Sequence, residues 1–244
     1  MLVRLILAIA LIAHAPLARA GDAAERAILG FSPDGRYFAF EQYGIQDGSG
    51  FPYSEISLID LNTDSWVDGT PVRIRLEDES QSLETARRQA LEAARPFLDK
   101  ARVTDNARIL ASNVLYETVD DPRRMSFRTF YTSFGHLEPG ETDDAQFSLL
   151  LEEFVLPAPK DCPAGDTPLA GFVLKAKHGS GAFEEIYRDR EIPASRRCPL
   201  KYSLSDAVSL PAADGSIQRL VVLVNVFAYG FEGPDRRFVA VPLQ

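Results

Sequence analysis

Phe31-Ser-Pro-Asp-Gly-Arg-Tyr-Phe-Ala-Phe40 is the segment that most clearly predicts β structure in this chain. Its first part, Ser32-Pro33-Asp34-Gly35, predicts a type I turn, because proline presets φ at the second position and glycine suits the fourth. An apolar run at residues 28–31 precedes the turn, and aromatic residues that favour strands follow it up to Tyr43. The stretch therefore predicts two strands joined by a tight turn.

The strand pattern continues beyond a loop rich in glycine, aspartate and serine at residues 44–52. The next segments alternate polar and apolar residues or favour β structure, with a turn at residues 62–65. Strand-like runs occupy residues 55–61, 66–67, 72–76, 108–116, 127–134, 147–156, 171–177, 183–190, 220–228 and 237–241. Breakers rich in proline and aspartate separate them. The chain is thus predicted to be mainly β, with antiparallel β-meanders in a propeller-like or sandwich arrangement.

One amphipathic helix is predicted at about residues 81–102. Apolar residues recur there at helical spacing, and charged residues occupy the opposite face. Pro96 is expected to break or kink the helix in its second half. The apolar face is narrow and rich in alanine, which favours a helix packed on a sheet over a helix that binds a partner.

Residues 1–20 have the pattern of a signal peptide. Arg4 precedes an apolar run of about nine residues, and Ala18-Arg19-Ala20 is an A-x-A cleavage site ahead of Gly21. The run is about half as long as a membrane anchor needs. We expect cleavage after Ala20 and a soluble, periplasmic or secreted product that does not span a membrane.

Composition and charge narrow the class of partner. The full chain has 244 residues and a net charge of −9. Residues 21–244 keep 24 basic and 35 acidic residues, a net charge of −11. This balance argues against nucleic acid or an anionic membrane as the partner, because both need a surplus of Lys and Arg on the contact face. No linker of low complexity divides residues 21–244, so they are predicted to form a single β-rich domain.

Cys162 and Cys198 are the two cysteines of the chain. In an exported protein an even number of cysteines predicts a disulfide bond, and two buried free thiols are the alternative. Closing a loop of this length would stabilise the fold by about 4 kcal/mol in the chain-entropy model. A catalytic thiol is disfavoured, since no C-x-x-C motif is present and no histidine lies nearby in the sequence.

Two segments of the chain are alike in outline. An Asp-Gly turn, a strand ending in Tyr-Gly, a loop with proline and a further strand occur at residues 34–61 and again at residues 214–243. The spacings differ by six residues, so the likeness needs an insertion. Repeated units of this kind are typical of a propeller or another radial β array, and coincidence is the alternative, since Asp-Gly turns are common.

The segment from Phe31 to Thr63 resembles the repeat of TolB-type β-propellers, in which a Ser-Pro-Asp-Gly turn precedes one strand of a blade and an Ile-Asp-Leu strand follows. As a whole the chain resembles an uncharacterised bacterial family of predicted secreted proteins with a domain of unknown function. The features that carry this resemblance are the signal segment, the blade-like motif and the run from Tyr229 to Phe238. The resemblance implies a periplasmic or secreted location and no known activity.

Motifs for catalysis, metals or cofactors are weak in this sequence. The histidines of the exported part, His136 and His178, lie in no G-x-S-x-G motif, and no short-spaced zinc ligand set is visible. The Asp60-Leu-Asn-Thr-Asp64 segment begins like a calcium loop but lacks the glycine and glutamate that such a loop requires. No cofactor or metal is therefore predicted.

Aromatic residues on loops are the remaining candidates for function: Tyr43, Phe51, Tyr53, Tyr229 and Phe231. They suit recognition, because aromatic side chains give large contact area at low entropic cost; packing into the interior is the alternative. The leading hypothesis is a non-enzymatic, exported binding module for a protein or polysaccharide partner.

Two other hypotheses remain open. One is a carbohydrate-directed hydrolase with a carboxylate pair, which predicts a deep cleft lined by acids of raised pKa. The other is a purely structural envelope protein without a discrete ligand.

Overall fold

The computed structural model describes residues 21–113, 121–128, 146–162 and 168–243, and the predicted signal segment lies outside them. Its elements follow one another along the chain as β1 (Glu25–Phe31), β2 (Tyr37–Ile45), β3 (Pro52–Asp60), β4 (Ser65–Trp66), β5 (Val72–Arg75), α2 (Leu83–Ala101), β6 (Arg108–Ser112), β7 (Arg124–Arg128), β8 (Gln146–Leu156), β9 (Leu169–His178), β10 (Glu184–Arg188), η1 (Ala194–Arg196), β11 (Pro199–Pro211), β12 (Ile217–Ala228) and β13 (Asp235–Leu243). The mainly β prediction is confirmed.

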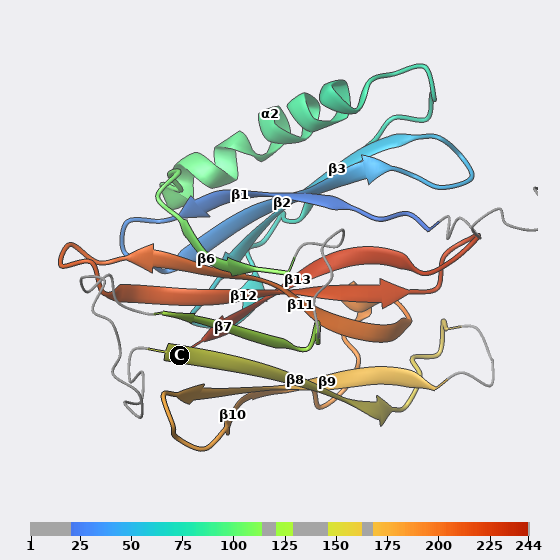
Figure 1. The fold of residues 1–244 in the computed structure, drawn as a ribbon. Helices are drawn as coiled ribbons and strands as arrows, with labels where there is room; N and C mark the ends of the chain where they lie inside the picture. Colours follow the sequence, from blue (N-terminus) through green and yellow to red (C-terminus); the bar gives the residue numbers. More distant parts are fainter. Residues whose placement is uncertain (1–20, 114–120, 129–145, 163–167, 244) are drawn as a thin grey trace, which may run out of the picture.

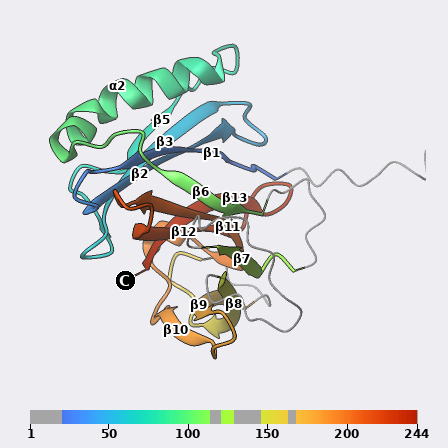
Figure 2. The ribbon, with the colours of Figure 1, turned by 60° about the vertical axis from the view of Figure 1, so that its left-hand side comes forward.

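These elements form four layers, shown edge-on in Figure 1. Helix α2 covers the upper sheet, which has the order β1-β2-β3-β4 with β5 also paired to β3. The central sheet, β13-β12-β11-β6, lies beneath it, and the lower sheet, β10-β9-β8-β7, lies beneath the central one. Figure 2 shows the same stack after a turn of 60°. All pairings within the sheets are antiparallel.

The turn at Ser32–Gly35 joins β1 to β2 as predicted. The Gly35 N–H donates to the Ser32 carbonyl at 2.9 Å, and Gly35 has a φ of 70°, which glycine adopts without strain. The Ser32 hydroxyl accepts the Tyr37 N–H at 2.9 Å. These local bonds set the register of the meander from β1 to β3.

Helix α2 packs on the upper sheet, as its Ala-rich face predicts. Ala86, Ala90 and Ala94 are buried, and Ala90 and Ala94 belong to a cluster with Ile56 of β3. Ser82 caps the first turn by accepting the Thr85 N–H at 3.1 Å. The predicted break at Pro96 does not occur, because the exposed proline leaves the buried alanine face in place and the helix runs on to Ala101.

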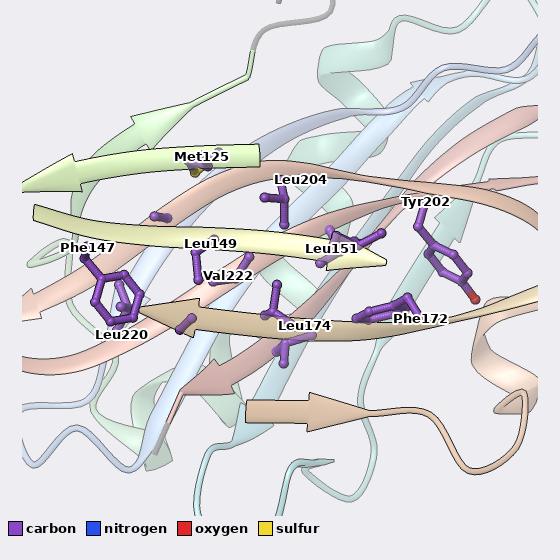
Figure 3. Packing of buried hydrophobic residues seen from close by; sticks show 14 of the residues in the cluster. Met125, Phe147, Leu149, Leu151, Phe172, Leu174, Tyr202, Leu204, Leu220 and Val222 are labelled. Atoms are coloured by element: carbon purple, nitrogen blue, oxygen red, sulfur yellow. The ribbon is translucent and has the colours of Figure 1, made fainter. Parts of the chain in front are cut away.

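Two hydrophobic cores separate the three sheets. Between the upper and central sheets the core is built on aromatic residues such as Phe31, Phe38 and Phe40. Between the central and lower sheets, Leu and Val of β11 and β12 pack on β8 and β9, as Figure 3 shows for Leu204, Val222, Leu149 and Leu174. The central sheet is therefore covered on both faces, which explains the almost uninterrupted apolar run of β12.

Face-to-face stacking corresponds to the sandwich alternative. In the described ranges the sheets form no ring of blades, so neither the propeller-like arrangement nor a TolB-like repeat is seen. The two similar segments are real meanders, β1-β2-β3 and β11-β12-β13, but they lie in the upper and central sheets and pack on each other. Their loops meet at one end: a methyl group added at Gly48 would lie 3.2 Å from the Phe231 ring.

A disulfide bond joins Cys162 to Cys198, with Cα atoms 5.6 Å apart. This confirms the cysteine prediction. It ties the start of β11 to the segment that follows β8. Among the residues of known conformation, none forms a helix with the length and apolarity that a bilayer crossing requires.

Candidate functional site

A cleft with a volume of about 360 Å³ opens along β13, and we call it the β13 cleft. The inner side of the upper sheet contributes Gln42, Glu55 and Ser57. The turn after β3 contributes Asp64, and β4 contributes Trp66. The opposite side is the segment between β10 and β11, with Arg196 and Arg197, and β13 supplies Asp235 and Arg237. The cleft therefore collects polar side chains from three separate parts of the chain.

Strand β13 is an edge strand of the central sheet, and its outer edge is partly closed. The Arg236 N–H donates to the Asp22 carbonyl at 2.8 Å, and the Ala24 N–H donates to the Arg236 carbonyl at 3.1 Å. The Phe238 N–H donates to the side-chain oxygen of Gln42 at 3.0 Å. Pro242 has no N–H to offer. These contacts occupy backbone groups at the outer edge of β13 and make the addition of a further β-strand there unfavourable. The cleft therefore suits a ligand that contacts the side chains of the protein better than one that pairs with its backbone.

The N-terminal segment fixes Arg237, one of the residues that line the β13 cleft. Asp22 is buried, and its carboxylate accepts the Tyr53 hydroxyl at 2.7 Å and the Arg237 guanidinium at 2.5 Å. Burial raises the pKa of the Tyr53 hydroxyl. Tyr53 and Arg237 are thereby held in one position before any ligand arrives.

Arg196 holds the opposite wall in place. Its guanidinium lies 4.7 Å from the ring centre of Phe172 and within 6 Å of those of Tyr187 and Tyr202. It donates to Asp189 at 2.5 Å and to the Tyr187 hydroxyl at 2.6 Å. Both members of this ion pair are buried. The wall of the cleft is thus anchored in the core between the central and lower sheets.

Two acids of the cleft have raised pKa values. Desolvation raises the pKa of Asp64, and the nearby Arg196 guanidinium opposes it with a smaller effect. Desolvation also raises the pKa of Asp235, in spite of the Arg237 guanidinium. The hydrolase hypothesis predicts a deep cleft lined by acids of raised pKa, and it stays a prediction.

Trp66 lies at the rim of the cleft and exposes 41% of its surface. The Arg73 guanidinium lies 5.6 Å from the centre of the Trp66 ring and pairs with Glu55 at 2.6 Å. An exposed indole beside fixed polar groups is a common recognition element, because one side chain supplies both apolar area and an N–H donor.

A family model for "Predicted secreted protein (DUF2259)" matches residues 39–244. The chain belongs to this family. The match begins within β2, after the Ser32–Gly35 turn, and covers all the residues that line the β13 cleft. No curated protein matches the chain.

Membership of a secreted family, together with the disulfide, places the protein in the periplasm or outside the cell, as the sequence predicted. The family description names no activity or ligand, so the site has to be interpreted from its own chemistry.

The five aromatic residues predicted for recognition have different environments. Tyr43 lies under the Arg87 guanidinium of α2, 3.7 Å from its ring centre, and Tyr53 is held by Asp22 and Arg237. Phe51 and Tyr229 are half-buried, whereas Phe231 is 81% exposed at the tip of its loop. Their role in binding stays a prediction.

Sequence reasoning missed Asp64, Trp66 and Arg196 as site residues. It tested residues 60–64 as a calcium loop and then interpreted residues 62–65 as a turn, and it interpreted the Arg196-Arg197 pair as solvated charge or salt-bridge partners. One signal in the sequence could have pointed to these residues. The chain has a single tryptophan, Trp66, and it stands two residues after an acid in a predicted turn.

Other candidate groups show no site. His178 packs edge-on against Phe147, with ring centres 4.7 Å apart, and His136 lies outside the described residues. Within the four described ranges, no three His, Cys, Asp or Glu side chains are placed to hold a metal ion.

Asp235→Asn is expected to raise the urea midpoint of unfolding at neutral pH. Because the folded-state pKa of Asp235 is raised, its ionised form destabilises the fold, and this effect is fully present above that pKa. The gain should shrink as the pH falls through the carboxyl range towards about pH 4, where the wild-type side chain takes up a proton. An equal gain at both pH values would contradict the assignment.

Proposed function

We propose that this protein is an exported glycan-binding module and that the β13 cleft holds the ligand. The observation that carries the proposal is the combination, in one cleft of about 360 Å³, of an exposed indole with positioned carboxylates and guanidinium groups. This volume lies at the lower end of ligand sites, and suits one or two sugar rings. The location outside the cytoplasm gives access to envelope and extracellular glycans.

The chemistry of a sugar fits the lining of the cleft. A sugar ring presents C–H groups on its faces and hydroxyls around its edge. The exposed Trp66 indole supplies an apolar surface for a ring face. Hydroxyls act both as donors and as acceptors, and the lining offers both kinds of partner in Arg197, Ser57 and Asp64. The mixture suits a hydroxyl-rich ligand better than an apolar one.

We propose that a longer ligand continues from the cleft onto the loop that precedes β13. Asp235 lies at one end of β13 and directly follows the loop that carries Tyr229 and Phe231. A glycan chain, or a protein that carries it, would reach Phe231 on leaving the cleft at Asp235. The loop aromatics are therefore proposed as an outer contact area.

Trp66→Ala is expected to weaken glycan binding at least about tenfold, which corresponds to about 1.4 kcal/mol, without changing the thermal midpoint. Binding is measured by calorimetry with envelope glycan fragments. Leu91→Ala on α2 is the matched control, because Leu91 has the same exposed fraction of 41% and lies away from the cleft. Equal binding by both variants would remove the proposal.

Hydrolysis is the second candidate, favoured by the raised pKa values of Asp64 and Asp235 in one cleft. The same calorimetry samples separate the two functions. A binding module leaves the glycan intact, whereas a hydrolase produces new reducing ends, and Asp64→Asn or Asp235→Asn abolishes their release.

A further inference from the structure

The arginines of the β13 cleft are all neutralised by acids. The four ion pairs join Arg73 to Glu55 at 2.6 Å, Arg196 to Asp189 at 2.5 Å, Arg197 to Asp235 at 3.7 Å and Arg237 to Asp22 at 2.5 Å. An anionic ligand would have to compete with a carboxylate for each of these guanidinium groups. The arginines therefore shape the cleft and give it little net positive charge.

Asp64 also lines the cleft, and it belongs to none of these four ion pairs. In the described part of the chain it forms no ion pair, since the nearby Arg196 guanidinium is paired with Asp189. Asp64 lines the cleft and its residue is exposed, although nearby protein atoms partly desolvate its carboxyl group, so a ligand in the cleft can reach the carboxylate. When Asp22 and Asp189, the partners of Arg237 and Arg196 from outside the lining, are counted with the lining residues, the four ion pairs cancel and Asp64 is left as a single negative charge next to the rim.

The position of Asp64 is set by its backbone. It has a φ of 47° in the turn that links β3 to β4, a conformation that aspartate and asparagine adopt more readily than most residues. Trp66 follows two residues later and is also exposed at the rim. The Asp64 carboxylate in the turn attracts a cation through its charge, and the exposed part of the Trp66 indole, at the end of β4 and beside Arg73, offers an apolar surface next to it.

We propose that Asp64 recognises the ammonium group of an amino sugar whose amine is free rather than acylated, with Trp66 packed on the same sugar ring. The inference rests on the proposed glycan-binding function and adds the class of sugar. A neutral sugar would leave the Asp64 charge without a counterion, and a uronic acid would add a second negative charge beside it. An ammonium group supplies three donors and the missing positive charge.

The test compares two probes that differ only at nitrogen, the trimer of glucosamine and the trimer of N-acetylglucosamine. Calorimetry is carried out at slightly acidic pH, where a primary amine is protonated. The wild-type protein is expected to bind the free amine at least about tenfold more tightly than the acetylated probe, a difference of about 1.4 kcal/mol. In Asp64→Asn the ratio of the two affinities should fall to near one.

Asp68→Asn is the matched control, because Asp68 is an exposed acid four residues further on and its replacement removes the same charge from the protein. It should keep the wild-type ratio. Loss of the preference in both variants would show general attraction to an acidic protein and would overturn the assignment of Asp64.

The outcomes also separate the two levels of the proposal. Equal affinity of the wild-type protein for both probes would overturn the amino-sugar inference and leave glycan binding standing. Failure of both trimers and of neutral glycans to bind would overturn the proposed function itself. Asparagine suits the backbone of residue 64, so Asp64→Asn is expected to fold, and its thermal midpoint checks this directly.

Discussion

Arg196→Met is expected to lower the free energy of unfolding by about 3–5 kcal/mol. The substitution keeps much of the side-chain volume but leaves Asp189, which is only 4% exposed, without its cationic partner. The Phe172 N–H and the Tyr187 hydroxyl would still donate to Asp189 but would not balance its charge. The ring faces of Phe172, Tyr187 and Tyr202 would also lose the planar guanidinium between them.

Urea unfolding at neutral pH measures this effect, with Arg190→Met as the control. Arg190 is an exposed arginine of the same segment, and its replacement should change stability by less than about 0.5 kcal/mol. A loss below about 1 kcal/mol for Arg196→Met would mean that the buried pair contributes no more than a surface pair. Because Arg196 holds one wall of the β13 cleft, the variant should also bind glycans more weakly than Arg190→Met does.

Replacing both cysteines by serine is expected to lower the free energy of unfolding by about 4 kcal/mol, the chain-entropy cost of opening this loop. Cys162 and Cys198 are 36 positions apart, and the unfolded chain regains the freedom that the bond removes. Reduction of the wild-type protein should give the same loss. The double variant, measured with and without reductant, is the control and should not respond.

The disulfide should matter for the cleft as well as for stability. Cys198 directly follows Arg196 and Arg197, so the bond fixes the wall that these two arginines form. We expect reduction to weaken glycan binding below the unfolding transition. Unchanged affinity in the reduced, folded protein would mean that the Arg196 cluster alone keeps the wall in place.

Local patterns predicted much of the secondary structure. The Ser32–Gly35 turn, the strand after it and the helix packed on the sheet through Ala86, Ala90 and Ala94 all follow from residues close together in the sequence. Of the break or kink predicted at Pro96, the break does not occur, since the helix continues to Ala101. Proline destabilises only the turn of the helix in which it stands, because it removes one backbone hydrogen bond there. Burial of the alanine face stabilises the helix along its whole length.

The candidate site was much less predictable. Aromatic loop residues drew attention because their side chains stand out in a sequence, yet Tyr43 and Tyr53 are occupied by Arg87 and Arg237 in the structure. The β13 cleft depends on residues as far apart as Gln42, Arg196 and Phe238. Ion pairs between residues so far apart in the chain produce no periodic pattern in the sequence, so the sequence could not predict them.

Residue type and short spacing were enough to predict the compartment, the disulfide, the β class and the helix that packs on the upper sheet. The stacking of the sheets and the cleft along the edge of β13 depend on contacts between residues that are far apart in the sequence. Sheet stacking is set by which apolar faces are buried together, and both meanders carry faces that suit either arrangement. The single unpaired acid of the cleft, Asp64, emerges only after the folded chain has paired all the others there.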